Sequence, residues 1–304
     1  MKTLIIYFSQ SGNTRKVAEY IRDGIVDVTG QCDIMDINDV DTSSLENYNL
    51  VGLGCPTHYF KEPFNVREFI EGLPELRNRQ WFVFCTHGSA IANTFPSLAE
   101  RLKKKGIIVI GYHDTYADAK MPYLPYPTLT TGHPDSLELE EAYAFGKEIA
   151  KRSQCIAEGD KSLIPKPEPV AEEWVREAEL YTLELLARIT PPMSINMDKC
   201  TRCHTCEDNC PVKGIDVEAD PPRIQNPCIY CLYCWKICPT LAIEADWKFL
   251  STFGPEMYAR LRQELDKAEA SGEFRWLIDP DSLNFNDPLY KQRERELKGK
   301  KQID

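Results

Sequence analysis

The sequence predicts an α/β protein in which a doubly wound, five-stranded parallel sheet is followed by a small α+β domain rich in cysteine. Short apolar runs alternate with amphipathic stretches over the first half of the chain, as in parallel sheets that carry helices on both faces. A proline-rich segment then ends this alternation. Eight of the twelve cysteines follow within one short stretch, from Cys200 to Cys238. These observations predict two domains of different kinds.

The elements of the first domain, residues 1–152, are predicted from the spacing of apolar residues. Short apolar runs predict strands, and apolar residues that recur every three or four positions predict helices. Strands are expected at residues 4–8, 32–37, 50–55, 81–85 and 107–112. Helices are expected at residues 14–26, 95–105 and 136–152.

Three further segments are predicted after the first domain. Residues 153–193 form a linker, stiffened by prolines at 165, 167 and 169, that contains an acidic amphipathic helix over 171–189. Residues 194–245 form the cysteine-rich domain. Residues 246–304 form a helical C-terminal extension with a helix over 254–270, and its basic end, 291–301, is expected to be a frayed and solvated terminus.

Composition excludes several classes of function. The net charge of -11 argues against nucleic acid as a partner, because phosphate binding needs a cationic face. No apolar run approaches the roughly 20 residues that a membrane-spanning helix needs, and the first residues lack the features of a signal peptide. We therefore expect a cytoplasmic protein. Disulfides need an oxidising compartment, so the many cysteines favour metal or redox chemistry.

The eight clustered cysteines form two copies of one spacing, which makes the two halves of this block an internal repeat. Each copy reads C-x2-C-x2-C-x3-C-P, the run that binds [4Fe–4S] clusters. Zinc sites favour two separated C-x2-C pairs instead, and soft thiolates suit iron–sulfur iron. The spacing therefore predicts two [4Fe–4S] clusters that move electrons one at a time. The cysteines are Cys200, Cys203, Cys206, Cys210, Cys228, Cys231, Cys234 and Cys238.

This block resembles the two-cluster ferredoxins. In that family the fourth cysteine of each run binds the other cluster. The resemblance implies that one cluster is held by Cys200, Cys203, Cys206 and Cys238. It implies that the other is held by Cys228, Cys231, Cys234 and Cys210.

A second candidate site follows the first predicted strand. Residues 9–14 read SQSGNT, and small hydroxyl residues with a glycine allow backbone N–H groups to face a phosphate at a helix N-terminus. The loop is neither the nucleotide-binding GxxxxGK[ST] nor the dinucleotide-binding GxGxxG, so nothing in the sequence indicates direct NAD(P)H binding. The alternative is an ordinary helix start capped by Ser11 or Asn13.

The loop, the strand that precedes it and the doubly wound pattern resemble flavodoxin. Its phosphate loop binds FMN, and the matching residues here are Ser9, Ser11, Gly12, Asn13 and Thr14. The resemblance implies that the flavin ring lies at the carboxyl ends of the strands. The segments there are Pro56, Thr57, His58, Tyr59 and Phe60, and Thr86, His87, Gly88 and Ser89.

Within these two segments, Tyr59 is the expected stacking partner of the flavin ring, against the alternative of a core or surface tyrosine. The second segment departs from flavodoxins, which usually place an aromatic there. His58 and His87 are candidates to move protons beside a flavin, or to have purely structural roles.

The whole chain resembles fusions of a flavodoxin with a two-cluster ferredoxin that occur in anaerobes. The resemblance implies an FMN and iron–sulfur electron-transfer protein that couples one-electron and two-electron partners. One alternative is an FMN-dependent reductase with the Tyr- and Pro-rich segment 112–132 over its substrate, and another is a flavin-free scaffold that docks the ferredoxin domain. Serine, cysteine or carboxylate catalysis has no recognisable constellation, so whether the carrier is also an enzyme stays open. Donor and acceptor proteins are the expected partners, and a homodimer is an option.

Overall fold

The structure is a computed structural model that describes residues 1–300, so the last four residues of the predicted extension, and the last residue of its basic end, lie outside it. The chain divides into two compact units. Unit 1 contains residues 1–118 and 132–179. Unit 2 contains residues 119–131 and the chain from Leu180 onward. The domain boundaries at 152, 193 and 245 stay predictions.

Unit 1 contains a five-stranded sheet in the order β2-β1-β3-β4-β5, and every neighbouring pair of strands is parallel. The predicted doubly wound sheet is confirmed. All five strands were expected, and β5 continues four residues beyond its predicted end. The strands are β1 (Thr3–Tyr7), β2 (Asp33–Asp36), β3 (Leu50–Pro56), β4 (Gln80–His87) and β5 (Ile108–Tyr116).

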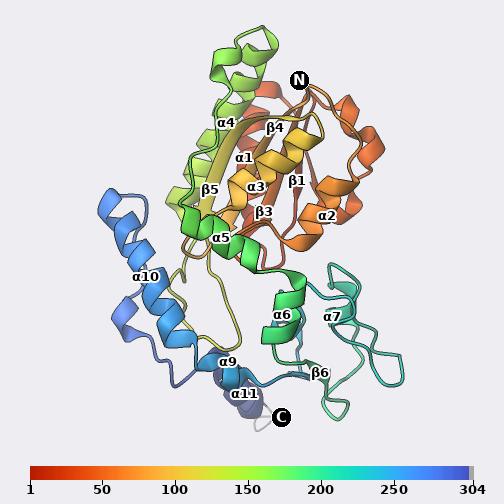
Figure 1. The fold of residues 1–304 in the computed structure, drawn as a ribbon, viewed down its shortest axis with the longest axis vertical. Coiled ribbons are helices and arrows are strands. Elements are labelled where there is room, and N and C mark those ends of the chain that lie inside the picture. The colour runs from red at the N-terminus through yellow and green to blue at the C-terminus, as the bar shows by residue number, and fades with distance from the viewer. Residues whose placement is uncertain (301–304) are drawn as a thin grey trace. The chain divides into compact units, whose positions relative to one another are not determined.

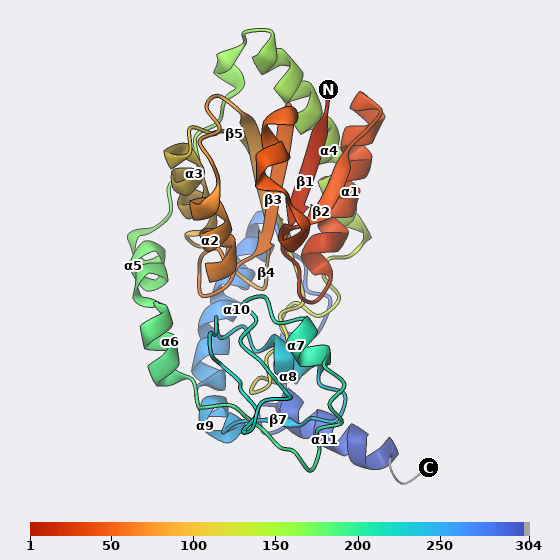
Figure 2. The ribbon, with the colours of Figure 1, turned by 90° about the vertical axis from the view of Figure 1, so that its right-hand side faces the viewer.

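Two helices cover each face of this sheet (Figures 1 and 2). The apolar sides of α1 (Asn13–Thr29) and α4 (Ser136–Ala157) pack with Ile5, Phe82 and Phe84 in one core cluster. Those of α2 (Phe64–Gly72) and α3 (Thr94–Lys104) pack with Leu53 and Trp81 in the other. Helix α2 was not predicted from the sequence. Because every strand runs in the same direction, the segments after β1, β3 and β4 emerge at one edge of the sheet.

Helices α1 and α4 approach each other closely at Gly146. A Cβ added there would lie 2.1 Å from the backbone oxygen of Ile21, which cannot move aside without shifting α1. Gly146→Ala should therefore lower the free energy of unfolding of unit 1 by about 1–3 kcal/mol. Gly72→Ala, in open space at the end of α2, is the matched control and should leave stability unchanged or slightly raised. Urea unfolding followed by circular dichroism measures both, and equal effects would show that the close approach does not matter.

The linker carries two helices where one was predicted. Helix α5 (Glu172–Leu180) ends before Thr182, and α6 (Leu183–Ile189) begins after it. Thr182 has an extended backbone, and its hydroxyl accepts a hydrogen bond from the N–H of Leu185, so it acts as a new N-cap. Threonine competes with helical hydrogen bonding in this way, which explains the break.

Unit 2 is built on a short antiparallel pair, β6 (Ser194–Ile195) and β7 (Ile243–Glu244). Besides α6, its described α-helices are α7 (Thr205–Asp208), α8 (Tyr233–Ile237), α9 (Trp247–Ser251), α10 (Gly254–Ser271) and α11 (Leu289–Lys300). The predicted helix at 254–270 matches α10. The basic end of the chain forms α11 as far as the described residues extend, where a frayed terminus was expected.

The segment 119–131, which joins β5 to α4, packs within unit 2. Met121 and Tyr123 lie against the core that contains Trp235 and Trp247. The backbone N–H groups of Leu289 and Tyr290 donate to carbonyl groups of this segment at 2.8 and 2.9 Å. Helix α11 therefore binds part of the segment 112–132. The reductase alternative predicted that this segment covers a substrate. Among the described helices, none combines the length and apolar character needed to cross a membrane.

Candidate redox sites

The two cysteine runs fold in the same way. Residues two and four positions after the first cysteine have left-handed backbones in both halves: Arg202 and His204 in the first, Tyr230 and Leu232 in the second, with φ between 52° and 57°. Lys213 and Leu241, which lie at equivalent positions after the two runs, also have left-handed backbones, with φ of 51° and 55°. Left-handed residues among right-handed ones turn backbone N–H groups into a common concavity that suits an anion or sulfide. The internal repeat in sequence is therefore also a repeat in conformation.

The eight cysteines line two separate cavities. One small cavity is lined by Cys200, Cys203, Cys206 and Cys238 together with Val217 and Ile243. The other is lined by Cys210, Cys228, Cys231 and Cys234 together with Ile215 and Ile229. Each cavity takes three cysteines from one run and the last cysteine from the other. We call them the Cys238 cavity and the Cys210 cavity.

Most cysteines of the two donor sets are partly or fully buried. Nowhere in the described part of the chain do three Cys, His, Asp or Glu side chains converge tightly enough to bind one metal ion. Burial raises the pKa of Cys206 to about 11, and the neighbouring Cys238 and Cys200 thiolates add to this. Burial likewise raises the pKa of Cys228 to about 11, with Cys231 and Cys210 adding. Bound iron would offset the cost of these buried thiolates.

Backbone N–H groups point at sulfur in both halves of the repeat. Gly214 donates to Sγ of Cys210 at 3.2 Å, and Ala242 donates to Sγ of Cys238 at the same distance. Tyr230 donates to Sγ of Cys228, again at 3.2 Å. Such hydrogen bonds stabilise negative charge on sulfur and help to set the potential of a cluster. The ligand assignment itself stays a prediction.

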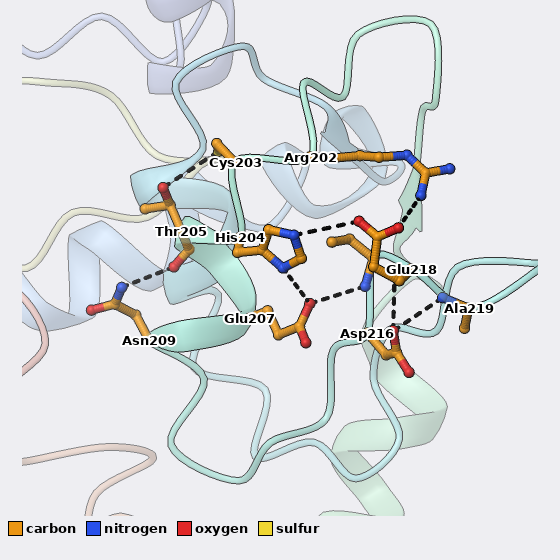
Figure 3. Close-up of polar contacts among 10 residues, drawn as sticks. Arg202, Cys203, His204, Thr205, Glu207, Asn209, Asp216, Glu218 and Ala219 are labelled. Atoms are coloured by element: carbon orange, nitrogen blue, oxygen red, sulfur yellow. Dashed lines mark hydrogen bonds and ion pairs between the residues drawn. The ribbon is translucent and has the colours of Figure 1, made fainter.

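A polar network holds the first run against residues 216–219 (Figure 3). The imidazole of His204 lies between two carboxylates, 3.3 Å from Oε2 of Glu207 and 3.4 Å from Oε1 of Glu218. Glu218 also pairs with Arg202, and Glu207 accepts from the backbone N–H of Val217 at 3.1 Å. This network fixes the conformation of the loop that presents Cys203.

The loop after β1 has the features of a phosphate site. Helix α1 has Gly12 as its N-cap residue, with φ of 89° and without a hydrogen bond from a capping side chain, so the alternative of a cap by Ser11 or Asn13 is wrong. The first N–H groups of α1 are therefore left to a ligand. Ser9 Oγ is buried and has no hydrogen-bond partner within residues 1–300. A buried hydroxyl without a partner is costly, and a phosphate oxygen would satisfy it.

Two threonines join the start of α1 to strand β4. The Thr14 hydroxyl, in the first turn of α1, lies 2.8 Å from the Thr86 hydroxyl at the end of β4, and both residues are buried. The Asn13 side chain donates to the carbonyl oxygen of Asp118 at 3.3 Å. The structure thus brings the predicted loop residues together with one residue of the predicted second segment.

The segment after β3 forms a tight turn. Tyr59 and Phe60 both have left-handed backbones, with φ of 51° and 65°, between two hydrogen bonds that join the backbones of His58 and Lys61. Phe60 packs on Trp174 of α5, with ring centroids 5.1 Å apart. The stacking of Tyr59 on a flavin stays a prediction. Pro56 and Thr57 precede this turn at the same sheet edge, and the Thr57 hydroxyl lies 3.0 Å from that of Thr94.

Strand β4 ends at a buried histidine, His87. His87 Nε2 lies 3.0 Å from Oδ2 of Asp114 on β5, and its ring centroid lies 4.5 Å from that of Tyr116. Its Nδ1 is buried without a hydrogen-bond partner among the described residues. Gly88 and Ser89, which follow it, are partly exposed. The Asp114 carboxylate orients this ring.

Helix α5 is anchored to the turn after β3 by Lys61, which sequence reasoning missed. The ammonium group is buried and donates to the carbonyl oxygen of Ala178. Together with the contact between Phe60 and Trp174, this bond holds the turn in place. A lysine beside an acidic helix carries no sequence signal of burial, because its partner is a backbone atom more than a hundred residues away.

Burial lowers the pKa of Lys61 from 10.5 to about 8. Between these values the unfolded chain keeps a proton that the folded protein has lost, so the free energy of unfolding should rise with pH. Lys61→Met should reduce this rise, as urea unfolding between about pH 8 and pH 10.5 would measure. Lys104→Met removes an exposed lysine and is the control. The same pH slope in wild type and Lys61→Met would contradict the burial of a charged group here.

Comparison with known families identifies both parts of the chain. The flavodoxin domain model matches residues 4–106, and the 4Fe-4S dicluster domain model matches residues 192–239. An uncharacterized protein of Methanocaldococcus jannaschii is 30% identical over 160 residues, which are 50% of this chain and 99% of that protein. A flavodoxin of Clostridium beijerinckii is 26% identical over 149 residues, 48% of this chain and 97% of that protein.

The cysteine-rich region has its own relative, an uncharacterized ferredoxin of Methanocaldococcus jannaschii. It is 32% identical over 60 residues, which are 18% of this chain and 97% of that ferredoxin. A dicluster domain implies two [4Fe–4S] clusters and redox partners. The chain thus belongs to the flavodoxin family in its first half and to the 4Fe-4S dicluster ferredoxins in its second, and is an electron-transfer protein with both domains in one polypeptide.

Proposed function

We propose that this protein passes electrons between two [4Fe–4S] clusters and an FMN, and so couples one-electron to two-electron redox partners in anaerobic metabolism. The observation that carries the proposal is the sorting of eight cysteines into two cavities of four. A bound flavin would accept one or two electrons, whereas each cluster carries one. The anaerobic setting rests on the resemblance to fusion proteins of anaerobes.

The residues of unit 2 would hold the clusters and exclude water from them. In the proposed assignment, Cys200, Cys203, Cys206 and Cys238 bind one cluster, and Cys210, Cys228, Cys231 and Cys234 bind the other. Ile195 and Ile243 line the Cys238 cavity, and Ile224 and Ile229 line the Cys210 cavity. Apolar walls lower the local dielectric constant and so influence the reduction potential.

The residues of unit 1 would hold FMN at the edge where β1, β3 and β4 end. In the proposed site the backbone of residues 9–14 and the hydroxyls of Ser9, Ser11 and Thr14 bind the phosphate, and the turns after β3 and β4 contact the ring. The uncapped start of α1 and the unsatisfied Ser9 hydroxyl support this placement. Because both units belong to one chain, each carrier is present at a high effective concentration for the other.

The composition of the purified protein tests the proposal. Protein prepared without oxygen should contain about eight irons and one FMN per chain, with the absorption of both chromophores. Bound zinc in place of iron would overturn it, and eight irons without flavin after added FMN would indicate the scaffold alternative. Steady turnover with a small acceptor in the absence of a partner protein would instead favour a reductase. Anaerobic size exclusion decides between monomer and homodimer.

A further inference from the structure

Helix α11 delivers an arginine to the edge of the Cys238 cavity. Nη1 of Arg293 donates to the carbonyl oxygen of Trp235 at 2.8 Å, and Nη2 donates to that of Cys238 at 3.0 Å. The guanidinium carbon lies 4.7 Å from the centre of the Trp235 ring. Two carbonyl groups and an aromatic face thus fix the position of this cation, all within unit 2.

The charge of Arg293 is held where solvent screens it poorly. The side chain is partly buried, and burial lowers its pKa, whereas the nearby Cys238 thiolate and Glu296 raise it. Arginine nevertheless stays protonated at any physiological pH. The guanidinium contacts the backbone of Cys238, the residue whose side chain lines the cavity.

The two halves of the cysteine repeat differ in charge at the corresponding place. Trp235 and Cys238 in the second run correspond to Glu207 and Cys210 in the first. The Glu207 carboxylate accepts from the backbone N–H of Val217 and lies beside His204. His204 and Val217 both line the Cys238 cavity, so the Glu207 carboxylate and the Arg293 guanidinium act on the same cavity with opposite charge.

Reduction adds one negative charge to a cluster. A fixed positive charge nearby lowers the energy of the reduced form and so raises the reduction potential, and this effect is largest where water is excluded. Hydrogen bonds from Arg293 to carbonyl groups beside Cys238 act in the same direction, because they withdraw electron density from the ligand's backbone.

We propose that Arg293 raises the reduction potential of the cluster bound by Cys200, Cys203, Cys206 and Cys238, and so favours the residence of an electron on that cluster. This inference rests on the proposed function, since it needs both clusters in place. It assigns a tuning role to the C-terminal extension, which lies outside the residues that match the dicluster domain.

A redox titration of the complete protein tests this assignment. Clusters are reconstituted without oxygen, dithionite supplies electrons stepwise, and electron paramagnetic resonance reports each cluster. Arg293→Gln should lower one of the two midpoint potentials, so that the ratio of reduced to oxidised cluster at a fixed potential falls roughly tenfold, equivalent to about 59 mV for one electron. Arg293→Lys keeps the charge and should retain most of the wild-type potential.

Arg295→Gln is the matched control, because it removes the same charge from the same helix. Its guanidinium is exposed and pairs with Asp287 at 2.6 and 2.7 Å, away from the carbonyl groups that Arg293 binds. We expect both potentials of this variant to match the wild type. Cys200→Ser should remove the cluster of the Cys238 cavity. In this background, Arg293→Gln should not change the midpoint potential of the other cluster.

The outcomes separate the inference from the proposed function. A protein that binds no clusters overturns both. Two clusters whose potentials are the same in wild type and Arg293→Gln overturn the inference alone, as do equal shifts of both potentials. Equal shifts in Arg293→Gln and Arg293→Lys would show that the side chain acts by anchoring α11 and not by its charge, and would also reject it.

Discussion

Cys238→Ser should abolish the same cluster as Cys200→Ser, although the two residues belong to different runs. In the structure both line the Cys238 cavity, whereas Cys210 of the first run lines the other. Loss of one thiolate ligand removes a cluster, so iron should fall from about eight to about four per chain. The electron paramagnetic resonance spectrum that remains should be the same for Cys238→Ser and Cys200→Ser, and different for Cys210→Ser.

The control for this experiment is Cys155→Ser, which removes an exposed cysteine of unit 1. It should keep all of the iron and both signals. If Cys238→Ser matched Cys228→Ser and not Cys200→Ser, each run would bind its own cluster, and the crossed assignment would be wrong. In that case the cluster bound by Cys238, and therefore influenced by Arg293, would be the one held by the second run.

Ser9→Ala should weaken FMN binding while leaving the protein without flavin at least as stable. The Ser9 hydroxyl is buried without a partner, so its removal takes away a desolvation cost of about 1 kcal/mol or more. A hydrogen bond to a charged phosphate contributes about 1.5–3 kcal/mol, so the dissociation constant should rise roughly 10- to 100-fold. Quenching of flavin fluorescence measures the affinity, and urea unfolding measures the stability.

Thr3→Val is the matched control for Ser9→Ala. The Thr3 hydroxyl is also buried without a partner in the part of the chain that the structure describes, but it lies at the start of β1, at the opposite edge of the sheet. Its removal should leave FMN affinity unchanged. A Ser9→Ala protein that binds FMN within about twofold of the wild type would mean that the hydroxyl does not contact the phosphate.

The order of strands and helices in unit 1 was predictable because it depends on local pattern. Apolar runs such as Leu50–Pro56 are buried on both faces, and parallel strands of this kind are nearly continuous apolar segments. The cysteine runs were equally predictable from the sequence, because a cluster needs ligands at set intervals along the chain. Helix α2 escaped prediction because nine residues are too few to establish a period.

Several details of the candidate sites had no local signal. Left-handed backbones at Arg202, His204, Tyr230 and Leu232 occur without a glycine to mark them, because the surrounding fold imposes them. The break between α5 and α6 depends on Thr182, a residue that also occurs within helices, so the sequence does not mark the break. The sequence also gives no sign that the Ser9 hydroxyl lacks a hydrogen-bond partner, since this depends on all the atoms packed around it.

The sequence by itself determined the sheet, the cysteine repeat and the glycine-containing loop at residues 9–14, since each depends on residues close together in the chain. Only the tertiary structure decided which residues from distant segments meet. It placed Arg293 on the carbonyl of Cys238, 55 positions earlier, and Trp174 on Phe60. A basic helix at the end of a chain looks like a solvated tail until its packing is known. The physical reason is that long-range contacts arise from the shapes of whole surfaces, which no periodicity in a short segment records.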